Sequence, residues 1–391
     1  MNISKNVSMF LILTTIFLIF PNFDALAETP KKARWTMIFF LSGDYIMDLY
    51  CEKDVTEMKK IGSTPEVNII VLQDHERKPA QKLYIKKGSA DILEEYKKID
   101  TGDQKELIKF VKWAIEKYPA DHYMISLWQH GGMWHHRGGN WIPLRICYDD
   151  GSANNITAIE LGDALKQIKE FSGKNIDILG MDCNLSQTLE NAYEIREYAD
   201  FIVSSEEDIP PNGWPYDLIL DGITKNPYMK PAGLASFIVK AFHEKYSTGC
   251  ESFTQSAIDC SKLNEAVKKL DAMADILIEK LDDKINKTAI DQAAASVQTY
   301  AVDDYCDLVH FCRLLKSSVK DETIIKAAGE VIDAITSGPS KLVIENKTSN
   351  DSVKNSEGIS IYLPKFRVSA KYGNTGLGKT RWTDFIKKYR K

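Results

Sequence analysis

The chain has 391 residues, of which 44% are hydrophobic, 27% charged and 10% aromatic, an ordinary globular composition. This length allows one large domain or two. The formal net charge of -5 argues against nucleic acid or an anionic membrane as the main partner.

The first 27 residues have the pattern of a secretory signal peptide. Lys5 supplies a basic start, Met9–Phe20 is an apolar run of 12 residues, and Ala25-Leu26-Ala27 is a small-x-small cleavage site. A run of this length is too short to span a bilayer. We therefore expect cleavage after Ala27, a secreted or periplasmic mature protein, and no membrane contact after cleavage.

Strand and helix patterns alternate along the first part of the mature chain. Apolar runs predict strands at Trp35–Leu41, Val67–Leu72, Gln81–Ile85, His122–Trp128, Ile176–Met181 and Phe201–Val203. Spacings of three and four predict helices at Leu49–Ile61, Lys105–Tyr118, Ile156–Phe171 and Leu185–Ile195. Residues 133–155 are predicted to be loop, and Thr157 with Glu160 forms a capping box. This alternation predicts a doubly wound, mostly parallel α/β sheet flanked by helices.

The pattern changes near residue 230. Long helices are predicted at Pro231–Tyr246, Lys262–Leu281, Thr288–Tyr300, Asp304–Leu315 and Thr323–Ser337. Late strands are predicted at Lys341–Glu345 and Gly358–Leu363. We expect an α/β core at 28–229 and a helix-rich region at 230–391 whose late strands complete the fold.

The chain has seven cysteines, an odd number, so at least one is unpaired within the chain. An oxidising compartment permits pairing of Cys250 with Cys260 and of Cys306 with Cys312. A domain of this size does not need disulfides, so buried free thiols fit equally well.

His130 and Cys183 each follow a predicted buried strand, 53 residues apart. Ligands bind at the carboxyl ends of parallel strands, and caspase-type peptidases have this order and distance of histidine and cysteine. The chemistry needs a thiol beside an imidazole, with amide groups nearby for the oxyanion. Gly131 and Gly132 let the backbone approach a substrate carbonyl. Taken alone, the two residues also fit a structural histidine and a buried cysteine.

Several sequence blocks resemble the clostripain family of cysteine peptidases along nearly the whole mature chain. They are Trp35-Thr36-Met37, Glu57-Met58, Val67-Asn68, Leu127–Trp134, Asp149-Asp150, Thr157–Leu161, Ser205-Glu206-Glu207, Pro211–Tyr216, Gly358–Pro364 and Trp382. The resemblance implies a caspase-like α/β fold and a Cys-His dyad that cleaves after Arg or Lys.

The resemblance also implies roles for single residues. His130 would be the acid and base, and the amides of Gly131 and Cys183 would form the oxyanion hole. Asp182 matches the family motif and would bind the basic substrate side chain, because an unpaired buried cation is very costly. Three further acids follow the predicted strand Phe201–Val203, namely Glu206, Glu207 and Asp208. They fit substrate binding and a solvated strand-end loop equally well.

The sequence departs from the family at the nucleophile. The family reads Asp-x-Cys with a glutamate six residues later, so alignment on Asp182 and Glu190 puts Cys183 at x and Asn184 on the nucleophile position. Asparagine cannot attack a peptide carbonyl in that role. Either Cys183 serves through a one-residue shift in the turn, or the chain is an inactive, peptide-binding relative. Inside a strand such a shift turns the side chain to the other face.

Two other signals are weaker. Gly373–Thr380 satisfies the phosphate-loop pattern, but a basic stretch precedes it and 11 residues follow, so the structural context is wrong. A metal hydrolase is a distant alternative, because the spacing of its candidate ligands matches no zinc motif. The candidate ligands are His130, His135, His136, Asp149 and Asp150.

We expect no catalytic metal and no required cofactor. The resemblance leaves calcium open, because some clostripain relatives require it. The acidic segment Asp149–Asn155 is the candidate, although it lacks the glycine and the spacing of an EF-hand.

The first function hypothesis is an exported cysteine endopeptidase that acts on peptides or proteins with Arg or Lys. It would be a monomer or a self-cleaved two-chain form. Family members often mature by cutting between the catalytic histidine and cysteine, and Arg145 is the candidate site because Ile146 would then begin the second chain. The second hypothesis is the inactive peptide-binding relative.

Overall fold

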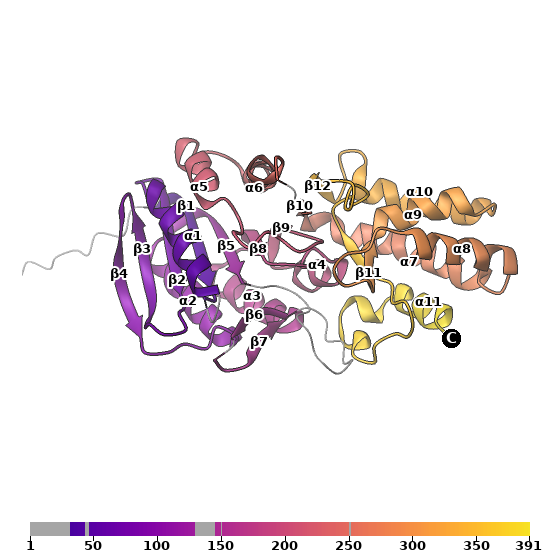
Figure 1. Ribbon diagram of the computed structural model, residues 1–391, viewed down its shortest axis with the longest axis horizontal. Helices are drawn as coiled ribbons and strands as arrows, with labels where there is room; N and C mark the ends of the chain where they lie inside the picture. Colours follow the sequence, from indigo (N-terminus) through magenta and orange to yellow (C-terminus); the bar gives the residue numbers. More distant parts are fainter. Residues whose placement is uncertain (1–31, 44–46, 130–144, 150, 250–251) are drawn as a thin grey trace, which may run out of the picture. The chain divides into compact units, whose positions relative to one another are not determined.

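The computed structural model describes residues 32–43, 47–129, 145–149, 151–249 and 252–391, and Lys32–Lys391 forms one compact unit (Figure 1). The predicted signal peptide lies outside the described residues. Among the described helices, none is both long and apolar enough to cross a bilayer.

Within the described residues, nine strands form the central sheet in the order β12-β10-β9-β8-β5-β1-β2-β3-β4. The strands β9, β8, β5, β1 and β2 are parallel, and the strands added at both edges are antiparallel. Their bounds are β1 (Ala33–Leu41), β2 (Val67–Gln73), β3 (Ala80–Lys86), β4 (Ser89–Tyr96), β5 (Ala120–Trp128), β8 (Ile176–Asp182), β9 (Ala199–Ser204), β10 (Thr254–Asp259) and β12 (Val343–Thr348). Two small ribbons pair β6 (Arg145–Asp149) with β7 (Asn154–Thr157), and β11 (Tyr305–Asp307) with β13 (Ser360–Tyr362).

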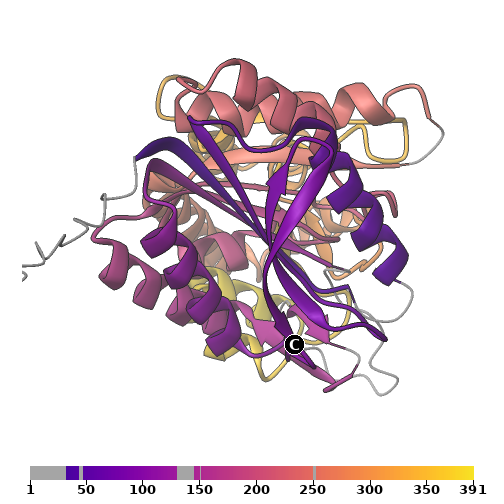
Figure 2. The same ribbon diagram turned by 90° about the vertical axis from the view of Figure 1, so that its left-hand side faces the viewer.

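Helices cover both faces of the sheet (Figure 2). One face packs against α1 (Asp48–Ile61), α5 (Tyr216–Lys225) and α6 (Pro231–Tyr246), and the other against α2 (Gln104–Lys117) and α3 (Ala158–Ser172). The remaining helices are α4 (Leu189–Ile195), α7 (Leu263–Lys280), α8 (Lys284–Ser296), α9 (Leu308–Ser318), α10 (Glu322–Thr336) and α11 (Arg381–Tyr389). Helices α10 and α11 both contact α7. The doubly wound, mostly parallel α/β prediction is confirmed.

Strand β8 separates the two hydrophobic clusters of the core. Successive side chains of a strand point to opposite faces. Leu179 and Met181 accordingly belong to the cluster on the α2 and α3 side, whereas Ile178 belongs to the cluster on the α1, α5 and α6 side. A Cβ atom on Gly180 would also point to this second side, toward Trp214.

Most predicted elements are present, including the capping box of Thr157 and Glu160. The helix predicted from Leu185 begins only at Leu189, because Leu185 is left-handed and Thr188 caps the helix. Strand β4 was not predicted because it is an exposed edge strand without apolar alternation. The ribbon β6–β7 contradicts the prediction of loop for that part of 133–155, and α5, β10 and α11 were not predicted either.

The six described cysteines, at 51, 147, 183, 260, 306 and 312, are all free and buried. This confirms the buried-thiol alternative for these residues, and Cys306 does not pair with Cys312. Cys250 lies outside the described residues.

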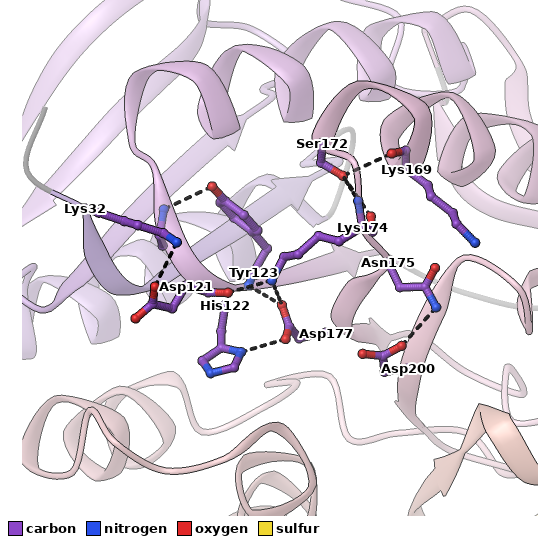
Figure 3. A network of polar contacts seen from close by, with 11 residues as sticks. Lys32, Asp121, His122, Tyr123, Lys169, Ser172, Lys174, Asn175, Asp177 and Asp200 are labelled. Atoms are coloured by element: carbon purple, nitrogen blue, oxygen red, sulfur yellow. Dashed lines mark hydrogen bonds and ion pairs between the residues drawn. The ribbon is translucent and has the colours of Figure 1, made fainter. Parts of the chain in front are cut away.

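A His–Asp pair lies at the amino ends of β5 and β8 (Figure 3). The Nδ1 atom of His122 is 2.6 Å from Oδ1 of Asp177. Oδ2 of Asp177 accepts hydrogen bonds from the Tyr123 amide at 2.8 Å and from the Lys174 ammonium at 2.8 Å. Because ligands bind at the opposite, carboxyl ends of the strands, we interpret this pair as a structural tie between β5 and β8.

Replacing Gly180 with alanine should destabilise the fold. The added Cβ atom would lie 2.7 Å from Cη2 of the fully buried Trp214 and 3.2 Å from Cε of Met124. Overpacking of this kind costs about 1–3 kcal/mol. Urea unfolding should therefore show a lower free energy of unfolding for Gly180→Ala. The matched control is Gly373→Ala, whose new Cβ atom would meet nothing within 4 Å. Equal stability of the two variants would contradict the packing argument.

Candidate active site

The predicted site residues follow β5 and β8, which are neighbours in the sheet. Trp128 at the end of β5 pairs with Asp182 at the end of β8. The chain segments that leave these two strands therefore start side by side. His130 and Gly131 follow β5 but lie outside the described residues, so their predicted roles remain predictions.

Asp182 is a buried carboxylate held by the loop before α5. Its Oδ2 atom accepts hydrogen bonds from the Trp214 amide at 2.9 Å and from the Tyr216 hydroxyl at 2.8 Å. Gly213 has a φ of 56°, and a Cβ atom there would lie 2.7 Å from the same oxygen, so this close approach requires glycine. Burial raises the pKa of Asp182 to about 7, although both hydrogen bonds oppose the rise.

Two further buried acids lie near Asp182, and the sequence reading did not identify them as functional. Asp54 and Glu57 of α1 are 1% and 7% exposed. Burial raises the pKa of Asp54 to about 9, and the charges of Asp182 and Glu57 add to the rise. Asp54 lies among the buried residues of α1 between Cys51 and Val55, so an acid inside an apolar stripe was the available signal. We call Asp54, Glu57 and Asp182 the buried acid cluster.

The ammonium group of Lys245 faces the buried acid cluster. Nζ of Lys245, from α6, lies 3.7 Å from Oε1 of Glu57. The charge of Lys245 also lowers the pKa of both Asp54 and Asp182. The cluster is therefore electrostatically coupled across α1, β8 and α6.

The Cys183 thiol lies on the other side of the sheet from the buried acid cluster. It is fully buried in the cluster with Met181 and Cys147, and its Sγ contacts the Leu127 carbonyl oxygen at 3.6 Å. Burial, with the neighbouring Cys147 and Asp182, raises its pKa well above the ordinary value. A protonated, buried thiol is a poor nucleophile.

The Asn184 side chain contacts the same loop, residues 209–216, that holds Asp182. Its Oδ1 accepts a hydrogen bond from the Ile209 amide at 2.9 Å, and Ile209 packs against the cluster on the α1 side. Two residues apart, Asp182 and Asn184 thus both contact the 209–216 loop, whereas Cys183 between them points away. The family alignment, which puts Asn184 on the nucleophile position, agrees with this geometry.

The acidic trio after β9 is mostly engaged within the protein. Oε1 of Glu206 accepts from the Tyr300 hydroxyl at 2.7 Å, and Oε2 accepts from the Gly358 amide at 3.0 Å. Glu207 accepts from the Ala301 amide at 3.1 Å, and Asp208 is exposed. Glu206 and Glu207 therefore tie the loop to the C-terminal region, and the proposed substrate contact of the trio remains a prediction.

In the segment that was considered for calcium, Asp149 accepts hydrogen bonds from two neighbouring backbone amides. Oδ1 of Asp149 accepts from the Ser152 amide at 2.8 Å, and Oδ2 accepts from the Thr101 amide at 3.0 Å. Both oxygens of Asp149 thus hold the turn. Asp150 lies outside the described residues, and nothing in the described turn adds support for a calcium role.

A second group of metal-binding residue types lies at the end of β2. One ligand atom from each of Asp48, Glu52 and His75 lies within 4.8 Å of the others. His75 Nδ1 is already 2.5 Å from Oδ1 of Asp48, and Lys78 pairs with Glu52. These internal pairs account for the group without a metal.

Comparison with known proteins gives one family. The profile of the Clostripain family matches residues 39–389. Clostripain from Hathewaya histolytica is 26% identical over 229 residues, which cover 49% of this chain and 43% of clostripain. The chain thus spans less than half the length of that relative.

Solved structures support the fold assignment. A secreted C11 cysteine protease from Bacteroides thetaiotaomicron, bound to an irreversible peptide inhibitor, aligns with a TM-score of 0.67 and 19% identity over 90% of this chain and 99% of that chain. An inactive zymogen C11 protease from Parabacteroides distasonis aligns with a TM-score of 0.65 and 19% identity over 92% and 99%. At this identity the likeness shows the fold.

The raised pKa values predict how stability depends on pH. A carboxyl group whose folded pKa exceeds its ordinary value of about 4 keeps its proton in the folded chain after the unfolded chain has lost it. The free energy of unfolding should therefore fall as pH rises, up to pH 7 for Asp182 and up to pH 9 for Asp54. Asp54→Asn should remove the part of this fall that Asp54 contributes between pH 7 and pH 9, on the order of 1 kcal/mol per pH unit.

Urea unfolding at pH 5, 7 and 9 measures this effect. Asp351→Asn is the control, because that side chain is 96% exposed. If Asp54→Asn and the wild type lose the same stability between pH 7 and pH 9, the burial argument for Asp54 is wrong.

Proposed function

The chain belongs to the clostripain family of cysteine peptidases, and we propose that it is an exported member that binds Arg- or Lys-containing peptides through Asp182 without cleaving them. Export is proposed from the pattern of residues 1–27. Binding of a basic side chain is proposed because Asp182 stands at the family's aspartate position, buried and with an oxygen, Oδ1, that has no hydrogen-bond partner among the described residues. A cation is the natural partner of such a group.

One observation carries the proposal that cleavage is absent. Asp182 and Asn184 both contact the 209–216 loop, whereas the thiol of Cys183 is buried on the opposite side of the sheet. A nucleophile must reach the same substrate whose side chain Asp182 binds. On the side of Asp182 the chain offers the amide of Asn184, whereas the thiol of Cys183 lies in the opposite hydrophobic cluster.

A second candidate function is the cysteine endopeptidase that cleaves after Arg or Lys. Cys183 thiolate would attack the carbonyl carbon, the Gly131 and Cys183 amides would hold the oxyanion, and His130 would protonate the leaving amine. The pairing of Trp128 with Asp182 favours it, because it starts the two catalytic segments side by side. The left-handed Leu185 also shows that the turn after Cys183 is irregular.

Self-processing belongs to this second candidate. The bond after Arg145 lies inside β6, which pairs with β7, and Ile146 is fully buried. Cleavage there would require this ribbon to open first. A single band on a denaturing gel after long incubation would count against it.

Moving the thiol by one residue should create reactivity. We expect an electrophilic peptide ketone that ends in Arg to leave the wild-type protein unlabelled and to label Asn184→Cys, because only position 184 shares the side of Asp182. Intact-mass spectrometry measures the covalent adduct. The double variant Cys183→Ala with Asn184→Cys should label as well as Asn184→Cys, and Asn184→Ser should not label.

The opposite pattern would favour the endopeptidase. Labelling of the wild type that is lost in Cys183→Ala would overturn the proposal that cleavage is absent. Calorimetry with the peptide acetyl-Gly-Gly-Arg-amide tests binding separately, and we expect Asp182→Asn to weaken it about 10-fold or more.

A further inference from the structure

The buried acid cluster has more acceptor capacity than the protein itself uses. Four of its carboxylate oxygens have no hydrogen-bond partner among the described residues, namely Oδ1 and Oδ2 of Asp54, Oε2 of Glu57 and Oδ1 of Asp182. Buried polar groups are normally hydrogen-bonded, so each such oxygen requires an explanation. Nothing in the fold of α1 explains why two acids are kept inside its apolar stripe.

The facing cation is held loosely. The Nζ atom of Lys245 is buried, yet none of its three N–H groups makes a hydrogen bond with a described residue. Among the described residues it forms an ion pair with Glu57 at 3.7 Å, and it lies 5.4 Å from the centre of the Tyr246 ring. The Lys245 side chain is 23% exposed, so its stem reaches the surface of the protein. Displacing this ammonium would therefore break few interactions.

We propose that Lys245 is an internal occupant of the ligand site, and that an incoming arginine side chain displaces its ammonium from Asp54, Glu57 and Asp182. The inference rests on the proposed binding of a basic side chain at Asp182. It adds Asp54 and Glu57 as specificity-determining residues, and it makes Lys245 a competitor of the ligand.

The number and placement of the free oxygens favour arginine over lysine. A guanidinium group has five N–H donors in a planar fork, and an ammonium group has three donors at one point. The four free oxygens belong to three carboxylates on two elements, α1 and β8. A planar guanidinium can donate hydrogen bonds to several of these oxygens at once. The Lys245 ammonium donates a hydrogen bond to none of them.

The charge of the site also couples ligand binding to protons. Burial raises the pKa of Asp54 to about 9 and of Asp182 to about 7. At neutral pH these carboxyl groups therefore hold protons, which a bound guanidinium would expel. The groups whose charges act on Asp54 or on which its charge acts are Asp182 of β8, Glu57, Lys53 and Cys51 of α1, Lys245 of α6 and Tyr216 of α5. Binding of arginine should therefore release protons and tighten as pH rises from 7 to 9.

Peptide affinity provides the first test. Calorimetry would compare acetyl-Gly-Gly-Arg-amide with the peptides that carry Lys or the neutral citrulline instead of Arg. We expect Lys245→Met to bind the Arg peptide about 10-fold more tightly than the wild type, and Asp54→Asn to bind it about 10-fold more weakly. The citrulline peptide should respond to neither variant. The matched control is Lys240→Met, on the same helix, which should stay within about 2-fold because Lys240 is 58% exposed and pairs with Glu345.

Rescue by a small cation provides a test that does not depend on peptide binding. Lys245→Ala leaves the acid cluster without its cation, so 10 mM methylguanidinium should raise the melting temperature of this variant by about 2 °C or more, relative to sodium chloride at equal ionic strength. The wild type and Lys240→Ala should show no such rise. Circular dichroism of each variant confirms that it is folded.

The two tests separate this inference from the proposed function. If the wild type binds the Arg peptide through Asp182 but Lys245→Met changes nothing and rescue fails, the inference is overturned and the proposed function stands. If rescue succeeds but neither the wild type nor Lys245→Met binds the peptide, the cluster is a cation site and the proposed function is overturned. Preference for the Lys peptide would overturn the assignment of arginine.

Discussion

The path of the chain at the end of β8, where the strand passes into a turn, is the constraint on which the rest of the site depends. Asp182, the last residue of β8, points to the α1, α5 and α6 side, and Cys183, in the turn that follows, points to the α2 and α3 side. Each is fully enclosed by the cluster that it enters. Turning the Cys183 thiol toward Asp182 would expose apolar surface on the α2 and α3 side. It would also bury the thiol in the packed core on the α1, α5 and α6 side. The chemistry of the site therefore depends on how the turn after β8 packs against its neighbours.

Desolvation governs the charges on the Asp182 side. The three buried carboxyl groups face the loosely held ammonium of Lys245, and burial favours the protonated forms of Asp54 and Asp182. A site of this kind is under-neutralised in the free protein. Such a site is stabilised most by a ligand that carries a positive charge and several hydrogen-bond donors. The same buried carboxyl groups thus affect both the stability of the fold and the choice of ligand.

Buried acids also join the C-terminal region to the sheet. Glu190 of α4 accepts hydrogen bonds from the Tyr362 amide and the Tyr372 hydroxyl. Burial and the neighbouring Asp307 raise the pKa of Glu206, and its two oxygens accept hydrogen bonds from the Tyr300 hydroxyl and the Gly358 amide. These contacts, together with β10 and β12 at the edge of the sheet, make residues 230–391 part of the same compact unit as the parallel core.

The sequence by itself determined the parallel core, most of the helices, the family, and the displacement of cysteine from the nucleophile position. These follow from local periodicity and from motifs whose residues are adjacent in the chain. It could not determine which way the Cys183 thiol points, because the turn after Asp182 allowed either orientation until its neighbours were packed around it. Nor could it bring Asp54, Asp182 and Lys245 together, since they lie on three elements far apart in sequence. Only the tertiary structure decided these points, because burial and charge coupling are properties of neighbours in space.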